Sequence, residues 1–306
     1  MTARIMTVSG PVDPDAMGIT LPHEHIIVDL RHSLYGFDTI LDDVPLAIDE
    51  LQVLKDAGGD AVVDVTNGCM GRDAQAQARI AQETGLKIIA ATGYYTEPYY
   101  PREVYKLSTD RLADLMVAEL TEGIDGTEVR AGIIGEIGTR RDFMSPAEER
   151  VFRAASRAQL RTGVAISTHT YLEQLIPDQL GIFEDEGVQP GRVIIGHLGD
   201  HRDMDRLRAI AAKGVYLQID HIGFEVQQRD RQRAKTVAEL IKDGHVSQLL
   251  LSMDLCAKSR LHWHDGHGYD YMLAGFAPLL AEEGVSQSEI DTMMIDNPRR
   301  ALAYEV

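Results

Sequence analysis

Two patterns of hydrophobic and polar positions occur in turn along this chain and are repeated many times. Short runs rich in Val, Ile and Ala are typical of buried strands, and the longer segments between them repeat apolar residues every three or four positions, as amphipathic helices do. The runs that predict strands cover residues 19–28, 61–66, 87–92, 131–137, 164–168, 193–196, 215–219 and 249–253. The helical pattern covers residues 44–57, 73–83, 109–122, 146–161, 172–186, 204–212, 231–242 and 271–282, and a final helical stretch covers 287–304.

Local signals support several of these helix boundaries. Ser145 precedes Pro146 and Glu148, which is the pattern of an N-cap serine, a proline in the first turn and an acid that completes a capping box. Ser286 and Glu289 repeat the box further along the chain. Several of the helical segments are followed by a glycine, which readily adopts the left-handed conformation that ends a helix. The strand and helix segments are therefore predicted as separate elements.

Eight strand-then-helix units in one chain predict a (β/α)8 TIM barrel. We expect a single domain over residues 1–306, with residues 1–18 as an N-terminal lead-in or hairpin, because no linker, low-complexity tract or short repeat divides the sequence. A doubly wound open sheet is the alternative fold. It usually carries a glycine-rich phosphate turn after its first strand, and neither a dinucleotide nor a P-loop motif occurs here.

Composition narrows the class of protein. The formal net charge of −18 argues against nucleic acid or an anionic membrane as the main partner, and we expect a small-molecule substrate. The two cysteines, Cys69 and Cys256, have no metal-ribbon spacing and fit a reducing compartment. Because the chain shows neither a secretory leader pattern nor a stretch of about 18 apolar residues, the expected location is cytoplasmic.

The first predicted strand carries a His-Glu-His sequence. His23 and His25 are two residues apart, so on a strand both side chains point to one face and place two imidazoles side by side. Such a pair suits a divalent metal ion. It is equally compatible with a hydrogen-bonded core pair or an exposed pair, so the motif alone is a weak signal.

Four more strand ends carry similar chemistry, namely Glu136, His169, His197 and Asp254. In a barrel all of these would meet at the carboxyl ends of the strands, where active sites lie. A buried carboxylate needs a compensating charge or hydrogen bonds. Each residue alone could be satisfied by hydrogen bonds, but their occurrence together at matching strand ends favours a metal site.

The sequence around these residues resembles a known protein family. Residues 18–25 match the G-x-T-L-x-H-E-H signature of the phosphotriesterase-related proteins, within the amidohydrolase superfamily. The similarity continues through Gly71-Arg72-Asp73, Ala91-Thr92-Gly93-Tyr94, Ile134-Gly135-Glu136-Ile137-Gly138, Thr168-His169, Ile195-Gly196-His197, Asp220-His221-Ile222 and Ser252-Met253-Asp254. It therefore spans nearly the whole chain.

The resemblance implies a site with two divalent ions per chain. By analogy His23, His25 and Asp254 bind the more buried ion, and His169 and His197 bind the more exposed one. A residue of the fourth strand bridges the two ions; it is a carboxylated lysine in the phosphotriesterases and many lactonases. Here Glu136 stands at that place, as in another branch of the family. Zinc is the first expectation, and Mn, Co or Fe also suit His and carboxylate ligands.

The expected reaction is hydrolysis by a hydroxide shared between the two ions. Asp254 would take the proton from this hydroxide and pass it to the leaving group. Asp200 could relay the proton or be a solvated loop acid, and His221 could line the pocket or support Asp254.

The loops after the seventh and eighth strands are expected to define the substrate pocket, and a residue after the third strand is a further candidate. Tyr95 follows the third strand, and Lys258 and Arg260 could hold an anionic substituent or be solvated charges. Trp263 could wall the pocket or pack in a homodimer interface. The nearby histidines at 262, 264 and 267 could suggest a third metal, although a mobile His-rich loop is the simpler interpretation.

The sequence leaves the scissile bond open. We favour a lactone or a carboxylic ester, with an N-acyl compound or a phosphoester as alternatives. A non-catalytic metal-holding binding protein is a more distant alternative, which retention of Asp254 opposes. A mononuclear deaminase is a further alternative, but Glu136 would then have no role as a bridging ligand.

Overall fold

The computed structural model describes residues 2–33, 36–225 and 228–305. Eight strands lie parallel in one sheet in the order β12-β11-β10-β9-β8-β7-β6-β3. They are β3 (Thr20–Glu24), β6 (Ala61–Asp64), β7 (Lys87–Thr92), β8 (Ile133–Thr139), β9 (Ile166–Thr170), β10 (Val193–Ile195), β11 (Tyr216–Ile219) and β12 (Leu249–Leu251). The sheet closes where the His23 amide donates to Ser252 Oγ at 3.0 Å and the Asp254 amide donates to the His23 carbonyl at 3.1 Å. The predicted (β/α)8 barrel is confirmed.

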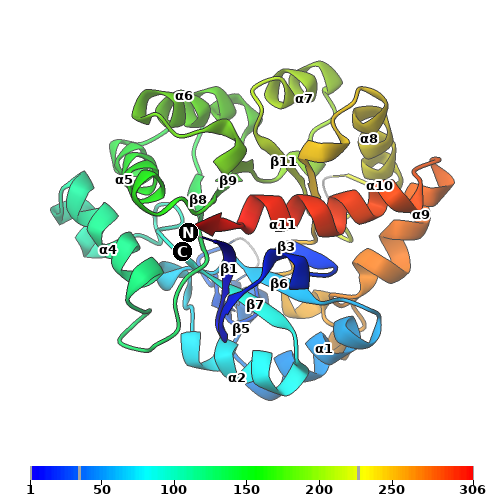
Figure 1. The fold of residues 1–306 in the computed structure, drawn as a ribbon, viewed down its shortest axis with the longest axis horizontal. Helices are drawn as coiled ribbons and strands as arrows, with labels where there is room; N and C mark the ends of the chain where they lie inside the picture. Colours follow the sequence, from blue (N-terminus) through cyan, green and yellow to red (C-terminus); the bar gives the residue numbers. More distant parts are fainter. Residues whose placement is uncertain (1, 34–35, 226–227, 306) are drawn as a thin grey trace.

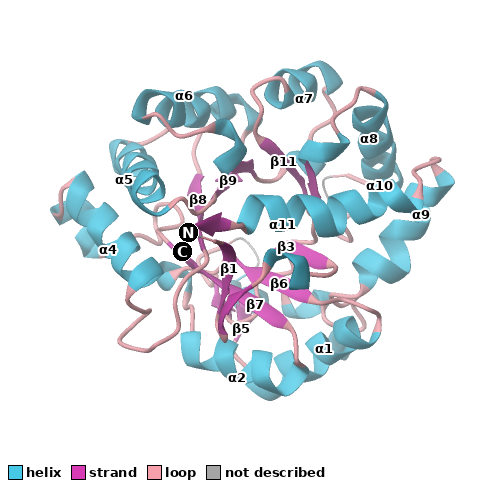
Figure 2. Cartoon of the chain, viewed as in Figure 1, coloured by secondary structure: helices cyan, strands magenta, loops and turns pink. Residues whose placement is uncertain are grey.

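Helices surround this barrel (Figures 1 and 2). The outer ring consists of α1 (Val44–Asp56), α2 (Ala74–Thr84), α4 (Thr109–Thr121), α5 (Pro146–Thr162), α6 (Ile176–Glu186), α7 (Met204–Ala211), α8 (Asp230–Lys242) and α9 (Ala277–Glu282). The short α3 (Arg102–Lys106) was not predicted, and α10 (Gln287–Asp291) and α11 (Asn297–Leu302) follow α9. Both predicted capping boxes, at Ser145 and Ser286, are present.

The amino ends of the strands are covered by the two chain termini. Strands β1 (Ala3–Thr7) and β2 (Gly10–Val12) pair in antiparallel fashion, and β13 (Tyr304–Glu305) pairs with the other edge of β1. Figure 1 shows β1 and α11 crossing the front of the barrel, near both termini. The side chains of Ile5, Met17 and Leu302 pack there against inward-facing strand residues such as Val63 and Leu250. This end is filled with apolar side chains, which leaves the carboxyl ends for chemistry.

Several element boundaries differ from the predictions. The first strand ends at Glu24 and not at residue 28, because an irregularity between Leu21 and Glu24 shifts the register where Pro22 offers no amide hydrogen. Val28–Asp29 (β4) instead pairs with Ile40–Leu41 (β5) in a separate ribbon. The last predicted helix is interrupted by a π-helical segment, Thr292–Asp296, and ends at Leu302. A second π-helical segment, Met272–Phe276, precedes α9.

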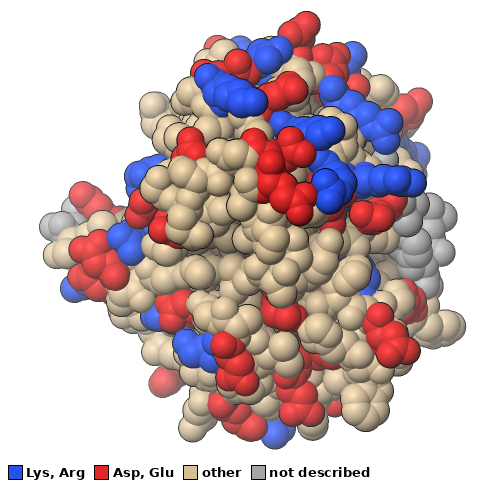
Figure 3. Space-filling view, turned by 90° about the vertical axis from the view of Figure 1, so that its right-hand side faces the viewer, with Lys and Arg blue, Asp and Glu red and all other residues tan. Residues whose placement is uncertain are grey.

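The surface carries charges of both signs. On the face that Figure 3 shows, acidic and basic side chains are interspersed, and a group of basic side chains lies in its upper part. The net charge of −18 is therefore not gathered into one acidic patch on this face. Among the described residues, no helix is both long and apolar enough to span a bilayer.

Candidate metal centre

Glu136 lies at the centre of a cluster of histidines inside the carboxyl end of the barrel. Its Oε1 lies 3.4 Å from His25 Nε2, and its Oε2 lies 3.5 Å from His23 Nε2. The same Oε2 lies 3.1 Å from His169 Nδ1 and 3.5 Å from His197 Nε2. One buried carboxylate therefore contacts both histidine pairs, one from β3 and its end and one from β9 and the loop after β10.

Asp254 completes the cluster from the loop after β12. Its Oδ1 lies 3.1 Å from His25 Nε2 and 3.7 Å from His23 Nε2. Its Oδ2 lies 2.9 Å from His221 Nε2. The structure thus brings together all the strand-end residues that the sequence singled out as metal ligands.

Three residues of the site hold a left-handed backbone conformation. The φ angles are 62° at His197, 57° at His221 and 49° at Asp254. Each residue follows the end of its strand by two or three positions. Such conformations cost about 1–3 kcal/mol each in a residue with a side chain and cluster at functional sites. The backbone strain at these three positions is offset by the contacts that fix the side chains in the cluster.

Several polar atoms in the cluster have no hydrogen-bond partner among the described residues. They are His23 Nδ1, His23 Nε2 and Asp254 Oδ1, all buried. Buried polar atoms without partners are rare in folded proteins. Two groups of ligand atoms share Glu136: His23 and His25 form one group with it, and His169 and His197 form the other, with ligand atoms within 4.8 Å of one another in each group. Imidazole and carboxylate donors so arranged fit divalent cations.

Both carboxylates of the cluster are kept ionised. Burial favours the neutral acid, but His169, His197 and His23 hold the pKa of Glu136 well below its usual range. At Asp254 burial acts in the same direction, and His221 and His25 hold its pKa well below the usual range too. Ionised carboxylates are the form that binds metal ions.

Two further acids that the sequence analysis gave no role position the ligands. Asp220 accepts from the His197 amide at 3.0 Å, and its other oxygen lies 3.1 Å from His197 Nδ1, so the ring presents Nε2 to Glu136. Glu24 accepts hydrogen bonds from Ser252 Oγ and from the amides of Met253 and Leu255 at 2.7–2.8 Å.

A signal for Asp220 was present in the sequence. Asp220 directly follows the apolar run of the seventh strand, and Glu136 lies within the apolar run of the fourth. Glu24 is the middle residue of the His-Glu-His motif, and its hydrogen bonds tie the first strand to the chain after the last one. The motif thus holds the two histidines and closes the barrel around them.

A chain of polar contacts leads from Asp254 away from the cluster. His221 Nδ1 lies 2.6 Å from Asp200 Oδ2, and Asp200 Oδ1 accepts from Arg233 Nη2 at 2.9 Å. Arg233 is fully buried and also pairs with Asp230 at 2.8 Å. Burial would raise the pKa of Asp200, but His221 and Arg233 lower it to about 2. His221 therefore contacts Asp254 directly, and Asp200 contacts His221.

A cavity of about 540 Å³ opens beside the cluster, lined by His169, His197, Asp254 and several of the expected pocket residues. The Tyr95 hydroxyl lies 3.3 Å from the His169 ring. Arg260 lines the cavity as well, but its guanidinium donates to the carbonyl oxygens of Ile222, Met253 and Asp254. Tyr95 thus packs on a ligand, and Arg260 holds the loop that carries Asp254.

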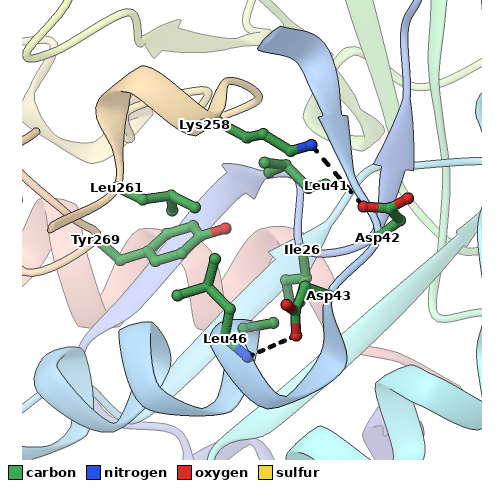
Figure 4. Close-up of a pocket in the computed structure, with 9 residues that line it drawn as sticks. Ile26, Leu41, Asp42, Asp43, Leu46, Lys258, Leu261 and Tyr269 are labelled. Atoms are coloured by element: carbon green, nitrogen blue, oxygen red, sulfur yellow. Dashed lines mark hydrogen bonds and ion pairs between the residues drawn. The ribbon is translucent and has the colours of Figure 1, made fainter. Parts of the chain in front are cut away.

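Lys258 and Trp263 lie outside the lining of this cavity, so the structure does not favour the pocket role, which was one of two expectations for each residue. Lys258 borders a separate small pocket beside Tyr269 and reaches towards Asp42, with 4.0 Å between Nζ and Oδ1 (Figure 4). Trp263 is 75% exposed because its segment turns outward. There Glu50 accepts a hydrogen bond from the Trp263 amide at 2.8 Å. In the described part of the chain, no group of potential ligand atoms includes the histidines at 262, 264 or 267.

A (β/α)8 barrel with histidines and carboxylates gathered at the carboxyl ends of its strands is typical of metal-dependent hydrolases. The family follows from comparison with known proteins: residues 3–302 match the model of the Phosphotriesterase family, and the chain belongs to this family. Divalent metal ions are the cofactors of this family, and the observed cluster could hold them.

Three relatives illustrate the range of the family. The structure of the phosphotriesterase homology protein from Escherichia coli, complexed with phosphate in its active site, is 38% identical with a TM-score of 0.91 and covers 94% of this chain and 99% of its own. The structure of a lactonase from Listeria monocytogenes is 26% identical with a TM-score of 0.93 and covers 99% and 100%. The N-acetyltaurine hydrolase of Tetraodon nigroviridis is 30% identical over 100% of this chain and 99% of its own.

Proposed function

We propose that this protein hydrolyses a lactone or a carboxylic ester with the help of two divalent cations. The observation that carries the proposal is the position of Glu136, whose Oε1 contacts His25 and whose Oε2 contacts His23, His169 and His197, so that one carboxylate joins both histidine pairs. A shared carboxylate between two ligand groups is the arrangement that a pair of ions requires. The proposed ligands are His23, His25, Glu136, His169, His197 and Asp254, with zinc as the first choice of metal.

The chain supplies the proton transfer. Divalent cations held by such ligands provide Lewis acidity, which activates water and polarises a carbonyl. Asp254 Oδ1 is buried and accepts no hydrogen bond from the residues that the structure describes, so it is placed to accept the proton of the attacking water. Its Oδ2 is bound to His221, which is bound in turn to Asp200. Asp254 would pass this proton to the leaving group, and the contacts through His221 reach Asp200, whose side chain is 19% exposed.

The similarity to a lactonase of 26% identity supports an acyl substrate, since it extends over 99% of this chain. An N-acyl amide is the second candidate. It is favoured by the 30% identity with an N-acetyltaurine hydrolase over the whole chain. Both substrates present the same carbonyl carbon to the same attacking water, so the site chemistry is shared.

A substrate screen with the metal-loaded protein tests the proposal. Lactones, carboxylic esters, N-acyl amides and phosphotriesters are compared by kcat/KM. We expect a lactone or ester to exceed every phosphotriester by about tenfold or more, which corresponds to about 1.4 kcal/mol of transition-state stabilisation. A leading amide would favour the second candidate, and a leading phosphotriester would contradict an acyl substrate.

A further inference from the structure

The wall of the catalytic cavity carries a cation, Arg140, that the metal cluster does not use. Arg140 follows β8 directly, and Glu136 and Gly138 are two residues apart on the same face of that strand. At about 3.3 Å per residue, Arg140 lies roughly 13 Å along the strand from Glu136. A Cβ atom at Gly138 would lie 2.6 Å from His169 Cβ, so glycine is needed between them.

Neighbouring residues hold Arg140 in place. Its amide donates to Glu148 Oε1 at 3.2 Å, and Glu148 is a buried member of the capping box of α5. Burial raises the pKa of Tyr99, although the Arg140 guanidinium beside its hydroxyl acts in the opposite direction. The Tyr99 ring packs on Tyr95 at 5.3 Å between centroids. The guanidinium therefore belongs to an aromatic wall that continues to the metal cluster.

The acids that line the same cavity are engaged elsewhere. Asp38 accepts hydrogen bonds from Ser259, and Asp200 pairs with Arg233 and His221. Asp254 belongs to the metal cluster. Among the described residues, Arg140 forms no ion pair with a carboxylate. A guanidinium in a partly enclosed cavity matches the planar oxygens of an anionic group.

We propose that Arg140 binds an anionic group of the substrate, a carboxylate, sulfonate or phosphate, at a distance from the scissile acyl bond. This inference rests on the proposed function, because it takes acyl hydrolysis as the reaction. Arg260 adds positive charge to the cavity, but its donors are directed to carbonyl oxygens. Arg140 is therefore the residue that selects anionic substrates over neutral ones.

Two matched substrate pairs test this role in the metal-loaded protein. The ester pair is 2-sulfoethyl acetate and 2-hydroxyethyl acetate, and the amide pair is N-acetyltaurine and N-acetylethanolamine. Within each pair a hydroxyl replaces the sulfonate while the acetyl group and the spacer stay the same. We expect Arg140→Met to lower the ratio of kcat/KM for the anionic over the neutral substrate by roughly 10- to 100-fold, mainly through KM. Arg140→Lys should restore part of the ratio.

The neighbouring Arg141→Met is the control, because Arg141 is exposed and outside the cavity lining, and it removes the same charge. This control should keep the wild-type ratio. An unchanged ratio in Arg140→Met, or an equal loss in both arginine variants, would overturn the inference.

A binding titration separates this inference from the proposed function. If none of the four compounds is hydrolysed, the acyl-hydrolase proposal fails for this substrate class. Calorimetric titration of N-acetyltaurine into Asp254→Asn protein, with and without Arg140→Met, then decides on Arg140. Binding that is lost with Arg140→Met supports the anionic subsite. Binding that is unchanged, or that is absent from the protein with Arg140 intact, rejects it.

Discussion

Asp254→Asn is expected to lower kcat by about 10³-fold, because general-base groups contribute about 10²–10⁴-fold to catalysis. Asparagine keeps the shape of the side chain but cannot accept the proton of the attacking water. Its oxygen can still lie near His25, and its amide near His221, so the fold should be preserved. Steady-state kinetics and metal analysis of the same preparation measure the effect and show whether an ion has been lost with it.

Asp265→Asn provides a matched control for this variant. Asp265 also has a left-handed backbone, with φ of 61° against 49° at Asp254, but it lies exposed in a loop outside the cavity lining. The same chemical change there should alter kcat by less than about twofold, as for other surface substitutions. Near-normal turnover in metal-loaded Asp254→Asn would remove Asp254 from the mechanism.

Glu136→Gln should disrupt the cluster itself. The amide is neutral, so it can no longer offer two anionic oxygens to the His23/His25 group and the His169/His197 group. We expect bound metal to fall from about two ions per chain to one or fewer. The loss of metal affinity should exceed the roughly 10–100-fold that mutation of a residue behind the ligands costs. Elemental analysis after dialysis measures it, and activity should fall in parallel.

Glu122→Gln, an exposed position at the end of α4, controls for the loss of one carboxylate from the chain. It should retain wild-type metal content and activity. A Glu136→Gln protein that binds two ions as tightly as wild type would show that Glu136 does not bridge them. Circular dichroism of both variants should match wild type, which separates loss of metal from loss of structure.

The barrel could be predicted from the sequence because every strand is buried and reads as a short apolar run between amphipathic helices. The boundaries of the strands could be predicted less well. Residues 19–28 were predicted as one continuous strand, but Pro22 interrupts the ladder and β3 ends at Glu24. The strand at residues 164–168 lies two residues later, at Ile166–Thr170, so His169 belongs to the strand itself. Such shifts depend on pairing with neighbouring strands, which a local pattern does not contain.

The candidate ligands could be predicted because a charged or imidazole side chain in an apolar strand is conspicuous. Asp220 carried the same signal without receiving a role, since its task depends on how the His197 ring is turned. Lys258 and Trp263 were expected in the pocket because they follow the last strand closely. Their direction is set by contacts with a segment more than 200 residues away, through Asp42 and Glu50. No pattern within the loop reveals those contacts.

A metal titration tests the central claim most directly. The protein is stripped with a chelator, and Zn²⁺, Mn²⁺, Co²⁺ or Fe²⁺ is added back while bound metal and hydrolysis of the best acyl substrate are measured together. The two-metal account predicts an inactive metal-free protein and activity that rises until about two ions are bound per chain. A metal-free protein with full activity, or full activity at a single bound ion, would contradict it.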